Sequence, residues 1–165
     1  MDMDEPLYTV AQAAEAAGVV VGTLRNWLQL GTVSLQKADA SAPAGGTRLL
    51  SHRRVLQVAV MVDLIALGVA PARASRLAFG FSDLATGAGP DNGMTMRAQG
   101  ALYSEPFSIL VAHPHAQWPR VLWAKTTTPA TSFLFAQTAH GMLSGLFLPL
   151  DPLVKRVHVV LGLND

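Results

Sequence analysis

The sequence predicts an α+β protein with a helical N-terminal domain (residues 1–80), a glycine-rich linker or long loop (81–100) and a small β-rich domain (101–165). Three observations lead to this prediction. Apolar residues recur at helical spacing in several short segments before residue 80. After residue 100, β-branched and aromatic runs dominate. Between these parts, residues 86–100 contain four glycines and a proline, which is typical of a linker.

The first element is expected to be a short helix over residues 9–17, "TVAQAAEAA". Thr9 is suited to cap its N-terminus because Gln12 follows three positions later, as in a capping box. Gly18 is suited to end the helix, because glycine readily adopts the left-handed backbone conformation found there.

A second helix is expected over residues 22–31, "GTLRNWLQLG". Helical spacing divides its side chains between two faces. The apolar face carries Leu24, Trp27 and Leu28. The polar face carries Gly22, Arg25, Asn26 and Gln29. Two short helices joined by a tight turn form a helix-turn-helix pattern.

A β-hairpin with a long tip is expected next. Its strands are predicted over residues 33–35 and 47–50, on either side of a stretch rich in Ala, Ser, Pro and Gly. Ser51 is suited to cap a third helix, from His52 to about residue 67, which is apolar on almost all sides and therefore expected to be buried. Gly68 ends it, and Pro71 begins a fourth short helix through residue 78.

The C-terminal part is predicted to contain strands over residues 107–112, 121–126 and 157–161, because these segments are rich in β-branched and aromatic residues. Residues 132–148 are compatible with either helix or strand. We find no internal repeat.

Composition and charge limit the possible functions. The chain has no cysteine, which excludes disulfides, thiolate metal sites and a cysteine nucleophile. The net charge is only +1, but seven basic and three acidic residues between positions 8 and 80 give that segment a charge of +4. A basic segment joined to a neutral one indicates a polyanionic partner.

The sequence favours a cytoplasmic, nucleoid-associated location in a bacterium. The acidic start "MDMDEP" lacks the basic and apolar regions of a signal peptide. The most apolar stretch, residues 55–70, contains Gln57 and Asp63 and is short for a bilayer span. We therefore expect no membrane partner.

The first 80 residues resemble the MerR-type winged helix-turn-helix domain. The resemblance rests on "YTVAQAAEAAGVVVGTLRNWLQLG", on "GTRLLS" in the position of the wing, and on "LGVAPARASRLA" after the apolar helix. It implies binding to double-stranded DNA and, less directly, a role as a transcriptional regulator. We expect the C-terminal part to make this regulator a homodimer. Members of the family carry a long coiled coil after the fourth helix, whereas this chain has the glycine-rich stretch.

The resemblance implies a set of DNA-contacting residues. In the second helix, arginine can pair with guanine and asparagine or glutamine with adenine. Gly22 allows the N-terminus of that helix to approach a phosphate. Arg48 is expected to contact the DNA backbone, and Arg53 and Arg54 a nearby phosphate, although an ordinary exposed pair is nearly as plausible. The full set is Gly22, Thr23, Arg25, Asn26, Gln29, Arg48, Arg53 and Arg54.

No enzyme, cofactor or metal site is expected. The chain has no nucleophile elbow, dinucleotide-binding fingerprint or phosphate-binding loop. The spacing of His113, His115, His140 and His158 is not a specific zinc signature.

The C-terminal part leaves three roles open. Its aromatic residues favour self-association into a homodimer. An antitoxin-like or assembly adaptor that binds a protein partner, and a sensor that encloses a small molecule, remain alternatives.

Overall fold

The computed structural model describes residues 2–35, 39, 48–85, 97–103, 107–112, 118–124 and 145–163. These residues form five helices and two small antiparallel sheets, so the architecture is α+β, as predicted. In chain order the elements are β1 (Pro6–Thr9), α1 (Val10–Ala17), α2 (Val21–Gln29), β2 (Leu49–Ser51), α3 (His52–Ala66), α4 (Pro71–Ser82), β3 (Phe107–Ala112), β4 (Arg120–Ala124), β5 (Leu146–Pro149) and α6 (Asp151–Leu161).

The capping residues predicted for the first helix are confirmed. The Thr9 hydroxyl accepts a hydrogen bond from the Gln12 backbone N–H, and the Gln12 side chain accepts one from the Thr9 backbone N–H. Gly18 ends the helix in the left-handed conformation, with φ of 73°. Only residues 18–20 separate α1 from α2, so the two helices are joined by a short turn.

The predicted β-hairpin between residues 33–35 and 47–50 is wrong in its pairing. Strand β2 pairs antiparallel with β1, with Tyr8 opposite Leu50 and Thr9 opposite Leu49. Residues 32–35 form no strand. The N-terminal segment therefore supplies the partner strand, and the predicted tip of the hairpin lies outside the described residues apart from Asp39.

The long apolar helix is buried as predicted. The Ser51 side chain accepts a hydrogen bond from the Arg54 backbone N–H at its start, and every residue of α3 from 52 to 61 is buried. Gly68 follows the helix with a positive φ of 86°. Helix α4 begins at Pro71 and continues past the predicted end at residue 78 to Ser82.

The three-stranded sheet has the order β4-β3-β5 and is antiparallel throughout. Strand β3 has the bounds predicted from sequence. The predicted strand over 157–161 is wrong, because these residues belong to helix α6. Ser108 connects the sheet to this helix: its backbone N–H donates to the Asp151 carboxylate at 2.6 Å, and its carbonyl accepts from the Leu150 N–H at 2.9 Å.

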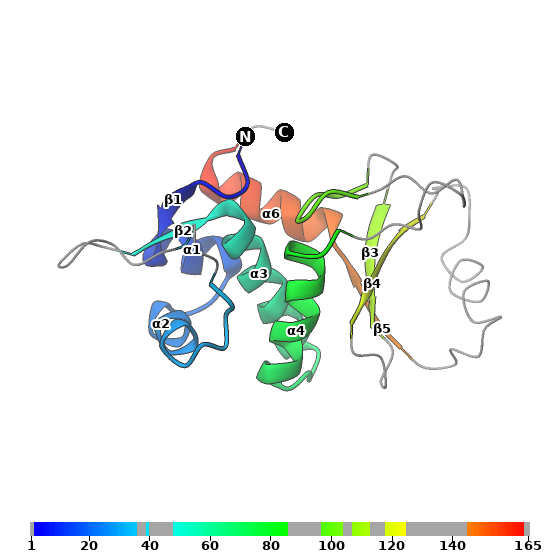
Figure 1. Cartoon of the computed structure of the whole chain (residues 1–165), viewed down its shortest axis with the longest axis horizontal. Coiled ribbons are helices and arrows are strands. Elements are labelled where there is room, and N and C mark those ends of the chain that lie inside the picture. Colours follow the sequence, from blue (N-terminus) through cyan, green and yellow to red (C-terminus); the bar gives the residue numbers. More distant parts are fainter. Residues whose placement is uncertain are drawn as a thin grey trace.

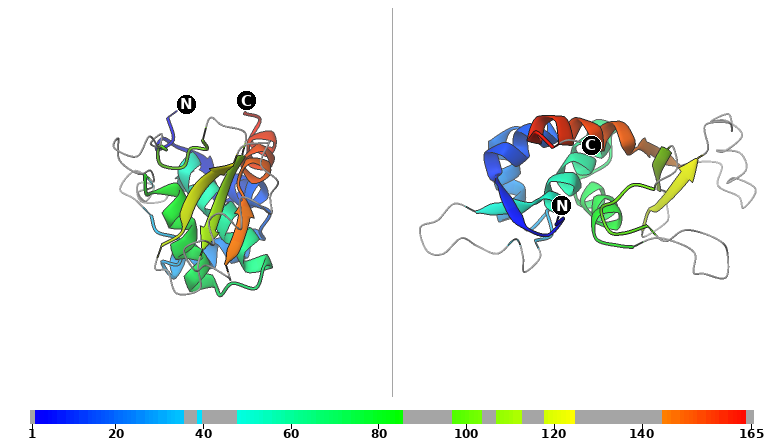
Figure 2. Two further views of the ribbon diagram at one scale, coloured as in Figure 1. Left: turned by 90° about the vertical axis from the view of Figure 1, so that its right-hand side faces the viewer. Right: turned by 90° about the horizontal axis from the view of Figure 1, so that it is seen from above.

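Helix α6 returns to the N-terminal half of the chain, so the predicted division into domains 1–80 and 101–165 does not hold. Figure 1 shows α6 running from the sheet across the helical part, and Figure 2 shows the same arrangement from above. Leu153 and Val157 of α6 belong to the same buried cluster as residues of α1 and α3. Arg156 also forms an ion pair with Asp63 of α3 at 3.0 Å.

The predicted linker is ordered where the structure describes it. The buried Arg97 guanidinium donates to the carbonyls of Phe81 and Leu84 at 3.0 and 2.9 Å, which fixes residues 97–101 against the end of α4. Burial lowers the pKa of Arg97 to about 10. None of the described helices has the length and apolar character needed to cross a bilayer.

Candidate nucleic-acid interface

Helix α2 has one buried and one exposed face, as its sequence predicts. Leu24 and Leu28 are buried, and Trp27 packs against the core while remaining partly exposed. The exposed residues of the helix include all five that were predicted to contact DNA: Gly22, Thr23, Arg25, Asn26 and Gln29. The structure thus brings one cation and two amides together on a single solvent-facing helix surface.

The N-terminus of α2 is open to an approaching molecule. Val20 precedes the helix and provides no side-chain cap, and the first turn contains no acidic residue. A Cβ atom added to Gly22 would meet no other atom within 4 Å. The partial positive charge of the uncapped backbone N–H groups is therefore accessible to an anion.

Arg48 precedes strand β2 and is half-buried. Among the described residues, neither Arg48 nor Arg25 forms an ion pair with a carboxylate. Both guanidinium groups therefore keep their charge uncompensated by a direct internal contact.

Arg53 does not belong to an exposed interface, which corrects the prediction. Its side chain is buried and makes a two-pronged ion pair with Asp4, at 2.6 and 2.7 Å. The same guanidinium donates to the Ser82 carbonyl at 3.0 Å and to the Gln99 side chain at 2.8 Å. Arg53 thus connects the N-terminal segment to the end of α4.

Arg54 is likewise an internal residue and not a DNA contact. Its guanidinium is fully buried and lies between the carboxylates of Asp39, at 3.1 Å, and Asp83. It also donates to the carbonyl of Ser34 at 2.8 Å. Because Ser34 and Asp39 follow α2, Arg54 fixes the chain that leaves this helix and thereby helps to orient it.

The carboxylates that neutralise Arg53 and Arg54 lie far away in sequence, and no local sequence pattern pairs them with these arginines. The sequence nevertheless contained a signal that these arginines are paired with carboxylates. Two arginines in the first turn of a helix oppose the helix dipole, and the buried pattern of α3 begins at that turn. A cation at such a position requires a carboxylate partner from elsewhere in the chain.

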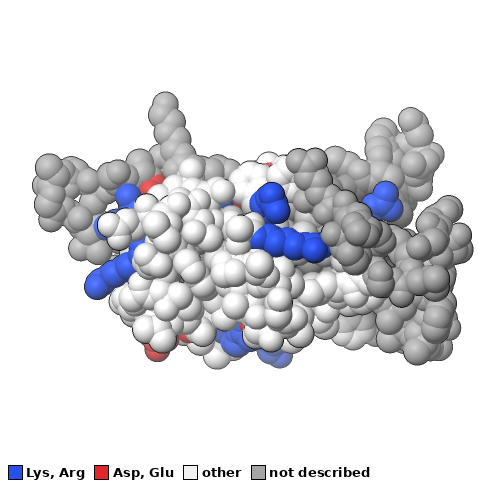
Figure 3. Space-filling view, turned by 90° about the horizontal axis from the view of Figure 1, so that it is seen from below, with Lys and Arg blue, Asp and Glu red and all other residues white. Residues whose placement is uncertain are grey.

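Helix α4 adds two cations that were not among the residues predicted to contact DNA. Arg73 lies in its first turn and is half-buried, whereas Arg76 is exposed. Figure 3 shows the side of the molecule on which α2 and the first turn of α4 lie. Basic groups are spread over a mostly uncharged surface there, and acidic groups are confined to its margins.

The two described histidines, His52 and His158, lie next to each other. His52 of α3 and His158 of α6 have ring centroids 5.1 Å apart, and the Nδ1 atom of His52 lies 3.1 Å from the Met3 sulfur. Burial and the nearby His158 lower the pKa of His52 to about 4. Within the described ranges, no three His, Asp or Glu side chains gather in an arrangement that could hold a metal ion. His113, His115 and His140 lie outside these ranges.

Comparison of the chain with protein-family models, with curated proteins and with solved structures finds no match in any of the three.

Proposed function

We propose that the protein binds double-stranded DNA sequence-specifically, with α2 as the helix that reads bases, and that it acts as a transcriptional regulator. The observation that carries the proposal is the exposed face of α2. It combines the uncharged amides of Asn26 and Gln29 with the cation of Arg25 beside an uncapped helix N-terminus. These are the groups that hydrogen-bond to base edges and to a phosphate.

The surroundings of α2 support this proposal. A helix that reads the major groove must protrude from its core with a polar outer face, and α2 packs its inner face against the core through Leu24 and Leu28. Arg48 adds a partly exposed cation outside the helix. Such a cation suits a phosphate contact, which positions the protein on the duplex without specifying sequence.

A homodimer is part of the proposed function, because one short helix contacts too few base pairs to be selective in a genome. The surface we assign to the second copy is the face of the β4-β3-β5 sheet that carries Phe107 and Phe147. Their side chains remain 46% and 37% exposed. Because Phe147 is opposite Val111 in the register, and Phe107 is four positions from Val111, both phenylalanines lie on the same sheet face. Apolar side chains of this size favour burial against a partner.

DNA binding is testable by fluorescence anisotropy with a mixed-sequence duplex at several salt concentrations. We expect affinity to fall steeply with salt, because protein cations displace counterions from the phosphates. The variant Arg48→Ala should show a shallower salt dependence, with the slope reduced by about one.

The matched control is Lys155→Ala, which removes an exposed cation from α6. This helix lies on the side of the molecule away from α2 (Figure 1). Its salt slope should equal that of the parent protein. Binding that is absent at low salt, or that depends on Lys155 as much as on Arg48, would contradict the proposed interface.

A further inference from the structure

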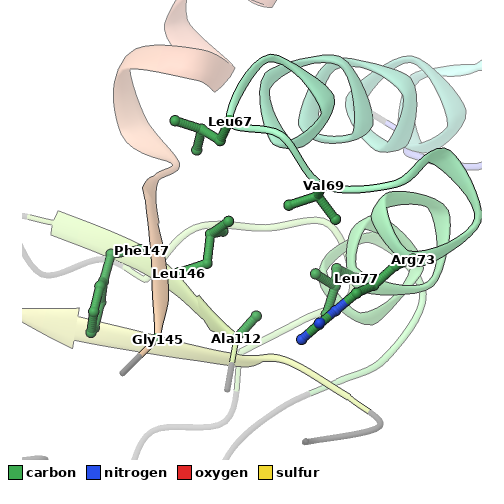
Figure 4. Close-up of a pocket in the computed structure, with 8 residues that line it drawn as sticks. All are labelled: Leu67, Val69, Arg73, Leu77, Ala112, Gly145, Leu146 and Phe147. Atoms are coloured by element: carbon green, nitrogen blue, oxygen red, sulfur yellow. The ribbon is translucent and has the colours of Figure 1, made fainter. Parts of the chain in front are cut away.

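Helix α2 ends on an exposed apolar residue, Leu30, which is one of the most exposed large apolar residues that the structure describes. The exposed fraction of Leu30 is 70%. Two other exposed apolar residues, Leu67 and Phe147, line a groove between the helices and the sheet (Figure 4). Leu30 is not part of this groove. The helix that we propose to read DNA therefore carries an apolar group in addition to its amides and its cation.

Leu30 lies on the same side of α2 as Asn26. The Leu30 backbone N–H donates to the Asn26 carbonyl at 2.9 Å, and its φ of −80° and ψ of −3° keep it in the right-handed helical region. Side chains four positions apart are neighbours on a helix, with Cβ atoms about 5–6 Å from each other. The outer face of α2 thus presents Leu30 directly beside an amide that is proposed to contact a base.

The core does not use the Leu30 side chain. Gly31 follows it with a positive φ of 69°. The Thr32 N–H then donates to the Trp27 carbonyl at 2.8 Å, and Val33 is buried. Val33 therefore supplies the apolar contact that commonly accompanies the end of a helix. This leaves Leu30 free to contact an apolar group of a bound molecule.

We propose that Leu30 contacts the 5-methyl group of a thymine and thereby makes the protein select thymine close to the base that Asn26 reads. This inference rests on the proposed DNA binding. The methyl group of thymine is the apolar group that bases present in the major groove. Successive base pairs are about 3.4 Å apart, so the spacing of the two side chains places this thymine within two base pairs of the base that Asn26 contacts.

The test replaces each thymine of a selected duplex in turn by deoxyuridine, which lacks only the methyl group. The duplex is first selected from a random pool with the full chain, and affinities are measured by fluorescence anisotropy. At one thymine, affinity for the parent protein should fall about fourfold, which corresponds to the burial of one methyl group. Leu30→Ala should bind the thymine and deoxyuridine duplexes of that position equally.

Two further variants assign the effect to the side chain of Leu30. Leu30→Met keeps an apolar side chain of similar volume and should retain most of the fourfold difference. Val159→Ala shortens an apolar residue of α6 that is similarly exposed, at 69%, and should match the parent protein.

A selected site that lacks thymine, a parent protein that tolerates deoxyuridine at every position, or a Leu30→Ala variant that keeps the difference would overturn this inference. Each of these results would leave sequence-specific DNA binding in place. Failure to select any sequence would refute the proposed function and this inference together.

Discussion

At the scale of single residues, substitution of Gly22 should affect folding stability and DNA binding in opposite directions. It lies in the first turn of α2 with a negative φ, and a Cβ atom there would touch nothing. The fold therefore does not require glycine, and Gly22→Ala should stabilise the protein by about 0.5–1 kcal/mol in urea denaturation. If α2 docks its N-terminus on a phosphate, the same methyl group should weaken DNA binding. A variant that is more stable and binds DNA unchanged would show that this end of the helix is not close to the duplex.

Arg54 leads to the opposite expectation, because its buried charge neutralises carboxylates inside the protein. Replacing Arg54 with Ala leaves the carboxylates of Asp39 and Asp83 buried without their shared cation. We expect a loss of about 3–5 kcal/mol in the free energy of unfolding, measured by urea denaturation. Arg25→Ala, which removes an exposed arginine, should change stability by no more than about 0.5 kcal/mol. A similar small effect for Arg54→Ala would contradict its assignment as an internal residue.

His52 makes stability depend on pH. Its pKa is lowered to about 4 in the folded protein by burial and by His158, against an ordinary value of about 6.5 in the unfolded chain. The unfolded state therefore binds a proton first as the pH falls. The stabilisation is fully present above about pH 6.5 and is lost toward pH 4, by about 3 kcal/mol. Urea titrations between pH 5 and 7 should show this slope, and His52→Gln should lack it. Equal slopes in both proteins would refute this origin.

The sequence predicted residues of α2 better than those of α3 for a physical reason. The two faces of α2 follow from the spacing of apolar residues within one short helix, which sequence shows directly. The burial of Arg53 and Arg54 depends on Asp4, Asp39 and Asp83. These carboxylates are distant in sequence and contact the arginines only in the folded chain. A local pattern does not reveal such contacts, so the same cations were interpreted as exposed.

At the scale of elements, α6 shows that local β-strand propensity can predict the wrong type of element. The segment "VHVVL" is rich in β-branched residues, which favour strands. Pro152 and Asp151 in the first turn and Gly162 at the end are nevertheless helix boundary signals. The buried residues Leu153, Val154 and Val157 have helical spacing, and packing against α1 and α3 outweighs the propensity.

The packing of α6 is testable with two substitutions on the same helix. Leu153 is buried, with 2% of its surface exposed, and Leu153→Ala should cost about 2–5 kcal/mol of stability. Val159 is 69% exposed, and Val159→Ala should change stability by no more than about 0.5 kcal/mol. Thermal and urea unfolding measure both values. If the two variants are equally stable, α6 does not cover the core as described.

The packing of α6 also changes the effect that we expect from truncating the chain. Two separate domains would allow the chain to be cut after about residue 86 to give a soluble monomer. Because α6 covers buried residues of α1 and α3, removal of the C-terminal part should instead expose apolar surface and destabilise the remainder. Point substitutions on the sheet are therefore better suited to testing its role in assembly.

At the scale of the whole molecule, sedimentation velocity tests the proposed homodimer. The full chain at tens of micromolar should sediment as a dimer, and Phe107→Asp should shift it to a monomer because a charge in an apolar interface lacks a partner. Val159→Asp, which alters an exposed apolar residue on α6, should leave the dimer intact. A parent protein that is monomeric under these conditions would indicate that the sheet binds a different partner.

The most direct test of the central claim is to select duplexes from a random pool with the full chain and then measure affinity for the selected site and for its single-base variants. With Arg25→Ala, we expect affinity for the selected site to fall by about 1–3 kcal/mol and discrimination to be lost at one base position. Arg48→Ala should weaken binding to all these duplexes equally. If Arg25→Ala binds the selected site as tightly and as selectively as the parent protein, α2 is not the helix that reads DNA.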